Sequence, residues 1–289
     1  MKPYSSPLRA NEKGSAVFAC NSILFVPGSR PERFAKAREA GAGLTVIDLE
    51  DAVAAPDKAS ARDAAVACIA PSPQGWAIRI NGVATAAGIA DLAALASAAM
   101  PEVLLVPMVE SARDLEVIVG ALGSACPALI PLIETPRGLR HALEIARAPN
   151  VAAVMFGGGD FAAELGVRLA WEPLLAARQQ LLLACAEAHV PAIDVPWIAL
   201  DDEVGLAREC AQARSLGFAA KAAIHPRQIA AIEAAFGPSA EELAEAEEAL
   251  AAFDAGGGQV LRFRGRMLEA PIIKHYRAVI ARSRGSVNA

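Results

Sequence analysis

No apolar run in this sequence approaches the ~20 residues that a membrane-spanning helix needs, so we expect no bilayer crossing. A secretory signal is also missing, because prolines and charged residues interrupt any apolar core between Pro3 and Lys13. The five cysteines include no Cys-x-x-Cys pair, and their odd number suits neither a disulfide framework nor a zinc ribbon. We therefore expect a cytoplasmic protein with reduced thiols.

An excess of positive charge is absent as well. The net charge of −5 and the pI near 5.5 argue against nucleic acid or an anionic membrane as the main partner. Charged residues make up 20% of the chain and hydrophobic residues 54%, which excludes an intrinsically disordered protein. There is no G-x-G-x-x-G fingerprint in the first strand–helix unit, no P-loop and no G-x-S-x-G elbow. Dinucleotide binding and acyl-enzyme hydrolysis are therefore not indicated.

What the sequence does contain is a regular alternation of short apolar runs and helix-compatible segments. The predicted strands are 22–28, 44–50, 76–81, 102–108, 128–134, 151–157, 190–195 and 218–224, and the predicted helices are 31–41, 56–70, 86–99, 111–122, 136–148, 172–188, 201–215 and 226–235. Most of the strands are continuously apolar, as expected where helices cover a parallel sheet. Eight such units predict an α/β protein with a (β/α)8 TIM barrel, and an open doubly wound sheet is the alternative.

The pattern changes after residue 236. Residues 239–253 predict a helix with a dense acidic face, which we interpret as a solvated surface. Three glycines at 256–258 predict a flexible break, which a short apolar segment and a final helix from about Pro271 follow. We therefore expect a barrel domain over residues 1–236 and a C-terminal helical tail over residues 237–289. This tail is expected to pack on the barrel or on a neighbouring subunit.

The chemistry of a (β/α)8 barrel is expected where its strands end. Glu134 and Asp160 end neighbouring predicted strands, so they could share one Mg²⁺ ion, which prefers carboxylates, waters and substrate oxygens. Helix capping or salt bridges would explain the two carboxylates equally well. Arg79 lies within an apolar strand, where it either pairs with Glu50 or Asp51 or binds a substrate carboxylate or oxyanion.

A run of three glycines, 157–159, follows the sixth predicted strand. Glycines let backbone N–H groups approach an anion closely, and a helix that begins there adds its positive end. The carboxylate or phosphate of a ligand could bind at this place. A plain tight turn is the other interpretation of the run.

Several motifs together resemble the citrate lyase beta-subunit-like family. They occur in the family's order between about residues 22 and 280, and they are Ile23–Arg33, Asp48–Val53, Arg79–Asn81, Leu132–Thr135, Phe156–Asp160, Ile224–Pro226 and Gly265–Pro271. The resemblance implies a (β/α)8 barrel that requires Mg²⁺ and assembles as a homotrimer or homohexamer. It implies a lyase that reversibly cleaves a 3-hydroxyacyl-CoA-type thioester, such as malyl-CoA, citramalyl-CoA or a citryl thioester. The products are an acyl-CoA and a keto acid.

The resemblance also assigns roles to individual residues. Glu134 and Asp160 match the metal ligands, and Arg79 matches the substrate-binding arginine, with Glu134 also touching substrate. Glu50 and Asp51 match an acidic pair that orders metal-bound water.

Two further glycines and one acid complete the expected site. The backbone N–H groups of Gly158 and Gly159, next to Asp160, could hold the carboxylate of the keto acid. Glu269 matches the family's tail acid, which acts on the site of a neighbouring subunit, and we expect it to protonate the enolate. Two positions depart from the family, because Met108 stands where relatives often carry lysine and Glu269 stands where active relatives carry aspartate.

Two other functions remain open, and a third is disfavoured. The same metal site could hydrolyse malyl-CoA as a thioesterase. The chain could instead be a subunit of a multi-component citrate lyase, acting on a thioester carried by an acyl-carrier protein. A catalytically silent CoA-binding protein is disfavoured by the intact set of acidic residues and arginine.

Overall fold

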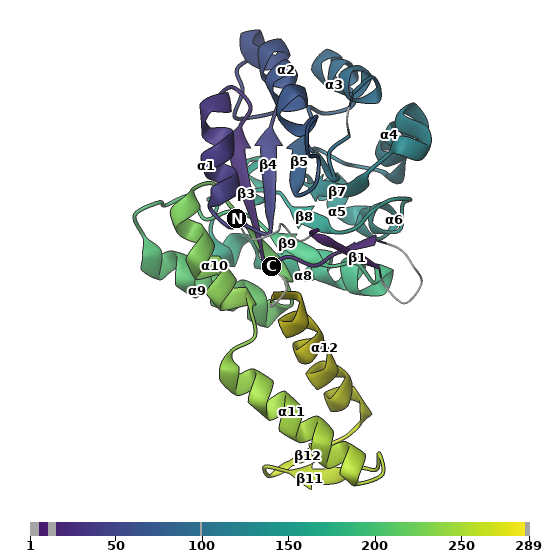
Figure 1. Ribbon diagram of the computed structural model, residues 1–289, viewed down its shortest axis with the longest axis vertical. Coiled ribbons are helices and arrows are strands. Elements are labelled where there is room, and N and C mark those ends of the chain that lie inside the picture. The colour runs from purple at the N-terminus through teal and green to yellow at the C-terminus, as the bar shows by residue number, and fades with distance from the viewer. Residues whose placement is uncertain (1–5, 11–15, 99, 287–289) are drawn as a thin grey trace.

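Eight parallel strands form a closed barrel in the computed structural model, which describes residues 6–10, 16–98 and 100–286 (Figure 1). The order around the barrel is β10-β3-β4-β5-β6-β7-β8-β9. The strands are β3 (Ser22–Pro27), β4 (Leu44–Asp48), β5 (Trp76–Arg79), β6 (Val103–Val106), β7 (Ala128–Ile133), β8 (Val154–Phe156), β9 (Ala192–Asp194) and β10 (Ala220–Ala223). Each lies within a predicted strand, so the predicted barrel is confirmed and the open sheet is wrong.

Helices alternate with these strands and surround the barrel (Figure 1). They are α1 (Phe34–Glu39), α2 (Lys58–Ile69), α3 (Ala86–Ala96), α4 (Ala112–Leu122), α5 (Pro136–Arg140), α6 (Ala142–Ala146), α7 (Gly158–Leu165), α8 (Trp171–Ala188), α9 (Glu203–Leu216) and α10 (Ile229–Phe236), with short 3₁₀ turns η1 (Pro31–Arg33), η2 (Ala55–Asp57), η3 (Gly123–Ala125) and η4 (Pro226–Gln228). The helix predicted over 136–148 is interrupted at His141, where the backbone leaves helical geometry and the ring Nδ1 contacts the carbonyl oxygen of Glu110. No helix in the described part of the chain is long and apolar enough to cross a membrane.

The apolar side chains of the strands form two layers. Successive strand residues face opposite sides, so Val46 of β4 packs inside the barrel and Ile47 packs against the helices outside. Both layers are buried, which is why most of the strand sequences are continuously apolar. A hairpin that the sequence analysis did not predict, β1 (Leu8–Ala10) with β2 (Ala16–Phe18), places Phe18 against the inner layer.

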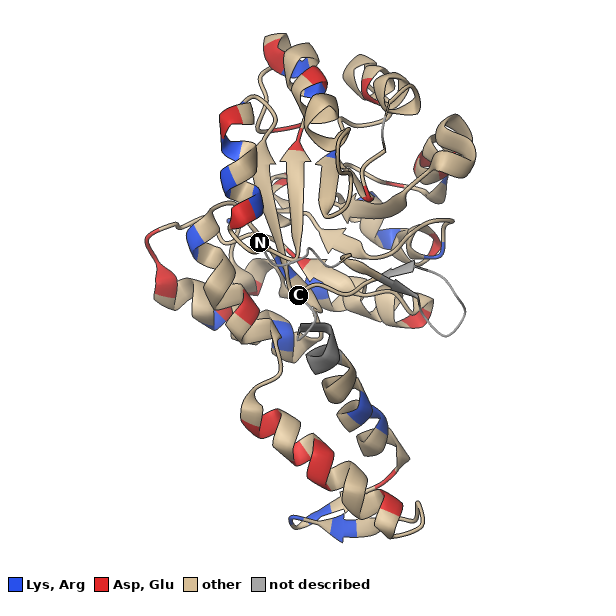
Figure 2. Cartoon of the chain, in the orientation of Figure 1, with Lys and Arg blue, Asp and Glu red and all other residues tan. Residues whose placement is uncertain are grey.

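The C-terminal residues form an arm that projects away from the barrel (Figure 1). It contains α11 (Ala240–Ala255), a hairpin of β11 (Leu261–Phe263) and β12 (Arg266–Leu268), and α12 (Ala270–Ser286). The two predicted helices are present, and the predicted short apolar segment is the hairpin. A small separate core of Ala249, Leu268 and Ile273 holds these elements together. Figure 2 shows acidic residues along α11 and basic residues on the hairpin and on α12.

The arm begins at the end of the barrel that carries the amino ends of the strands. Helix α10 returns from the carboxyl end of β10 toward the amino end, and the arm follows it (Figure 1). An ion pair of 2.7 Å between Arg214 of α9 and Glu242 of α11 connects the two parts.

Candidate active site

A cavity of about 440 Å³ lies at the carboxyl ends of the barrel strands. Its lining contains both charged and apolar residues. The charged residues are Asp48, Asp51, Arg79, Glu134 and Asp160, and the apolar residues include Phe25, Leu132, Met155, Leu169, Val195, Pro196, Ile198 and Ile224. This is the end of the barrel at which the sequence predicted the chemistry.

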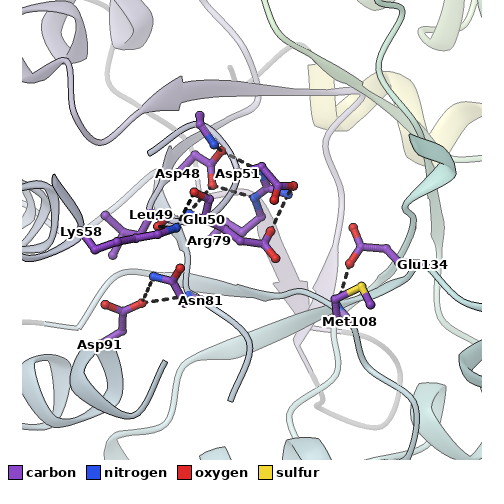
Figure 3. A network of polar contacts seen from close by, with 11 residues as sticks. Asp48, Leu49, Glu50, Asp51, Lys58, Arg79, Asn81, Asp91, Met108 and Glu134 are labelled. Carbon is purple, nitrogen blue, oxygen red and sulfur yellow. Dashed lines mark hydrogen bonds and ion pairs between the residues drawn. The ribbon is translucent and has the colours of Figure 1, made fainter. Parts of the chain in front are cut away.

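Arg79 is held in the cavity wall by Asp48. The two residues are register partners on β5 and β4, which brings their side chains together. Arg79 donates from Nε and Nη2 to the two carboxylate oxygens of Asp48 at 2.7 and 2.6 Å, a bidentate ion pair (Figure 3). Asp48 also accepts hydrogen bonds from the backbone N–H groups of Glu50 and Ala52, at 2.9 and 3.3 Å. One carboxylate therefore fixes both the arginine and the turn that follows β4.

The remaining nitrogen of the guanidinium group contacts the two predicted acids. Arg79 Nη1 lies 2.8 Å from Glu50 Oε2 and 3.3 Å from Asp51 Oδ2. Burial raises the pKa of Glu50 to about 8, against the lowering effect of Arg79 and with a further increase from nearby carboxylates. Burial alone would lower the pKa of Arg79, but its hydrogen bonds to Asp48 and the surrounding carboxylates raise it. Ion pairing, one of the two interpretations of Arg79, is therefore present. The sequence analysis missed its strongest partner, Asp48.

Glu134 follows β7 and is only 3% exposed. Its Oε2 accepts a hydrogen bond of 2.7 Å from the backbone N–H of Met108, which has a left-handed conformation with φ of 54° (Figure 3). Burial raises the pKa of Glu134 to about 7, the Met108 N–H and Arg79 lower it, and Asp160 raises it. Gly157 allows this arrangement, because a Cβ atom there would lie 2.1 Å from Glu134 Cγ.

Asp160 and the glycines come from the first turn of α7. Gly157 is the N-cap of this helix, and Asp160 lies in its first turn. Gly159 and Asp160 line the cavity, while Gly158 is buried beside it. The first turn of α7, whose N–H groups favour an anion, therefore lies in the wall of the cavity.

The carboxylates fit a magnesium ion better than they fit zinc. Within the described residues there is no group of three or more His, Cys, Asp or Glu side chains that could hold a metal. Mg²⁺ needs only one or two protein carboxylates, because water and substrate oxygens complete its octahedron. Glu134 and Asp160 are two such carboxylates in one cavity, and the nearest arginine is engaged by other acids. A divalent cation would relieve the repulsion that Asp160 exerts on Glu134.

Of the predicted site residues, five line this cavity (Asp51, Arg79, Glu134, Gly159 and Asp160) and three do not (Glu50, Gly158 and Glu269). Glu50 lies directly behind it through its contact with Arg79. Glu269 joins β12 to α12 in the arm, where its side chain is exposed and its carbonyl oxygen accepts the N–H of Ile273. The arm and the cavity lie at opposite ends of the barrel (Figure 1). Glu269 is therefore remote from the cavity of its own chain.

A family model described as HpcH/HpaI aldolase/citrate lyase matches residues 21–226, which span the barrel and every residue of this cavity. The chain belongs to the HpcH/HpaI aldolase/citrate lyase family. The resemblance inferred from the motifs is thus confirmed, and so is the prediction that the chain is an enzyme of a lyase family.

Relatives within this family have more than one activity in their names. The chain is 38% identical over 238 residues to a (3S)-malyl-CoA thioesterase of Cereibacter sphaeroides, covering 81% of this chain and 82% of that protein. It is 31% identical to human mitochondrial citramalyl-CoA lyase, covering 88% of this chain and 82% of that one. Among solved structures, Mycobacterium tuberculosis CitE in complex with magnesium, acetoacetate and coenzyme A superposes with a TM-score of 0.81 at 34% identity, covering 92% and 98% of the two chains.

Proposed function

We propose that this protein is a Mg²⁺-dependent carbon–carbon lyase. It cleaves, or in reverse forms, a 3-hydroxyacyl-CoA-type thioester such as malyl-CoA, citramalyl-CoA or a citryl thioester, with an acyl-CoA and a keto acid as products. The observation that carries the proposal is the cavity in which Glu134 and Asp160 lie beside Arg79 and the first turn of α7. The magnesium, coenzyme A and small acids named for CitE are ligands of the chemical kind that this cavity suits.

Different residues of the chain have different roles in this reaction. Glu134 and Asp160 would hold Mg²⁺, which supplies a Lewis acid for the oxygen that becomes the keto group. The N–H groups of Gly158 and Gly159 orient the carboxylate of the keto acid at the positive end of α7. Arg79 provides a fixed positive charge for the negative charge that develops on the thioester enolate.

The acidic turn after β4 is proposed to order water and to transfer protons. Asp51 lines the cavity, and Glu50 contacts the guanidinium group behind it. Burial raises the pKa of Glu50 to about 8, which suits a carboxyl group that gains and loses a proton near neutral pH.

Glu269 is proposed to protonate the enolate in the cavity of a neighbouring subunit. The position of the arm supports this, since the arm leaves its own barrel at the end opposite the cavity (Figure 1). A homotrimer or homohexamer would bring the arm of one subunit to the cavity of another. Mixing Glu269→Gln subunits with Arg79→Lys subunits tests this, because hybrid oligomers contain some sites with both residues intact. Activity that returns after subunit exchange supports the proposal, and full activity of Glu269→Gln alone contradicts it.

The proposed reaction is tested with a panel of CoA thioesters in the presence of Mg²⁺. Release of keto acid and of free CoA is followed separately for each substrate. Keto acid without free CoA identifies a lyase. Asp160→Asn should remove this activity, whereas the exposed Asp63→Asn on α2 provides the matched control. An absence of keto acid for every thioester refutes the lyase.

A thioesterase is the second candidate, because the 38% identical relative carries that name. In the same assay it would release free CoA without keto acid. A role as a subunit acting on an acyl-carrier-protein thioester would instead show as cleavage of carrier-bound substrates and not of CoA esters.

A further inference from the structure

Lys58 occupies a position that helix electrostatics disfavours. It is the first residue of α2, and η2 precedes it. The amino end of a helix carries partial positive charge, so a lysine there opposes the helix dipole. Acidic residues are the usual choice at this place. An interaction elsewhere must offset this unfavourable charge.

That interaction is with the acidic turn after β4. The Nζ atom of Lys58 donates hydrogen bonds to two consecutive carbonyl oxygens, those of Leu49 at 2.8 Å and Glu50 at 2.6 Å (Figure 3). Both peptide groups belong to the segment that carries Glu50 and Asp51. Lys58 itself is partly buried, so these hydrogen bonds form out of full contact with water.

The same turn is held from its other side by β5 and by its own aspartate. The N–H of Leu49 donates to the carbonyl oxygen of Arg79 at 2.9 Å, and the N–H of Glu50 donates to Asp48 at 2.9 Å. The peptide group between Leu49 and Glu50 is therefore fixed in both directions, by N–H donation to Asp48 and by carbonyl acceptance from Lys58, and the peptide group before it donates its N–H to β5. This turn decides where the Glu50 and Asp51 carboxylates stand relative to Arg79.

We propose that Lys58 is a positioning residue of the active site, which fixes the turn of residues 48–52 so that Glu50 and Asp51 meet Arg79 at the cavity. The ammonium group makes no contact with substrate in this role and acts through the backbone of the turn. The part of the proposal that concerns the rate rests on the proposed lyase function. The part that concerns the turn does not.

The rate is tested with Lys58→Met, which keeps a side chain of similar length and removes the donors, and with Lys58→Arg, which restores charge and donors. Lys36→Met, at an exposed position on α1, is the matched control. We expect Lys58→Met to lower kcat about ten- to a hundredfold with KM changed less than about threefold, because small displacements of catalytic groups act on kcat. Lys58→Arg should recover most of the loss. A kcat for Lys58→Met within about twofold of the wild type overturns the proposal.

Hydrogen exchange of the peptide that contains residues 48–55 provides a readout that needs no activity. In Lys58→Met we expect its amides to exchange about tenfold faster or more, with the rest of the barrel unchanged. Unchanged exchange there, or a uniform increase over the whole chain, overturns the positioning role. If Lys58→Met fails to fold, the comparison of Lys58→Gln with Lys58→Arg decides by the same two criteria. If the wild type cleaves no thioester, the lyase function fails and the exchange result alone decides on Lys58.

Discussion

The ion pair between Asp48 and Arg79 should stabilise the fold as well as the site. The side chains are 3% and 11% exposed, so removal of either residue leaves the charge of the other nearly buried and without its partner. Asp48→Asn replaces one acceptor oxygen with an NH₂ group, which must face a donor of Arg79 or of the backbone of the turn. Arg79→Met leaves Asp48, Glu50 and Asp51 without the cation that they share.

The expected magnitude follows from the burial of the pair. Breaking a buried, hydrogen-bonded ion pair by removing one partner costs about 3–5 kcal/mol of the free energy of unfolding. The two substitutions remove the same interaction, so the double variant should lose about 4–5 kcal/mol and not the sum of the two single losses. The coupling free energy between the two residues, which is the sum of the single losses less the loss of the double variant, is then about 2–5 kcal/mol. A loss of 3 kcal/mol corresponds to a decrease in Tm of about 5 °C for a chain of this size.

Urea unfolding of the wild type, both single variants and the double variant measures this coupling. Asp63→Asn, an exposed position on α2, is the control and should change the free energy of unfolding by less than about 0.5 kcal/mol. Additivity within about 0.5 kcal/mol would refute the reasoning, as would a loss below about 1 kcal/mol for Asp48→Asn.

Three further predictions concern the cavity and the thiols. Burial raises the pKa of Glu134 to about 7, so protons compete with Mg²⁺ for this carboxylate as the pH falls below 7. Calorimetry should show the apparent Mg²⁺ affinity falling about tenfold per pH unit in that range. Glu134→Gln should show no such dependence. Gly157→Ala should abolish activity in the thioester assay, because the added Cβ displaces Glu134, whereas Gly120→Ala on α4 meets no atom within 4 Å and should retain it. Burial raises the pKa of Cys185 to about 12 and of Cys210 to about 11, so a thiol reagent at pH 8 should label neither in the native protein; rapid labelling would contradict their burial.

The barrel could be predicted from the sequence because its determinants are local. Each strand is a short apolar run bounded by helix-compatible residues, and burial on both faces leaves a continuous pattern with little ambiguity. The break of one predicted helix at His141 was missed, since it depends on a contact with the backbone of Glu110. The N-terminal hairpin was missed because the packing of Phe18 inside the barrel is a long-range contact.

The site could be predicted in outline because its residues also lie at positions that local patterns identify. The carboxylates end strands, and the closed barrel brings strand ends together. The role of Asp48 depends on the register between β4 and β5, which no local pattern specifies. The left-handed conformation of Met108 could not be predicted from the sequence either, because it accompanies a hydrogen bond from the Met108 N–H to Glu134, which lies on another strand end. Lys58 could have been singled out from the sequence, since a lysine at the start of a helix is electrostatically unfavourable and so indicates a compensating interaction.

Closure of the barrel also has a consequence for the chain while it is being synthesised. Strand β3 pairs with β10 through a register that joins Ser22 to Lys221. At about 5–20 residues per second, a ribosome needs about 10–40 s to make the intervening stretch of about 200 residues. During that time β3 has one unpaired edge and apolar side chains on both faces, which is a template for association with other nascent chains. The yield of folded protein should therefore depend on chaperones and growth temperature during synthesis more than on the stability of the finished barrel.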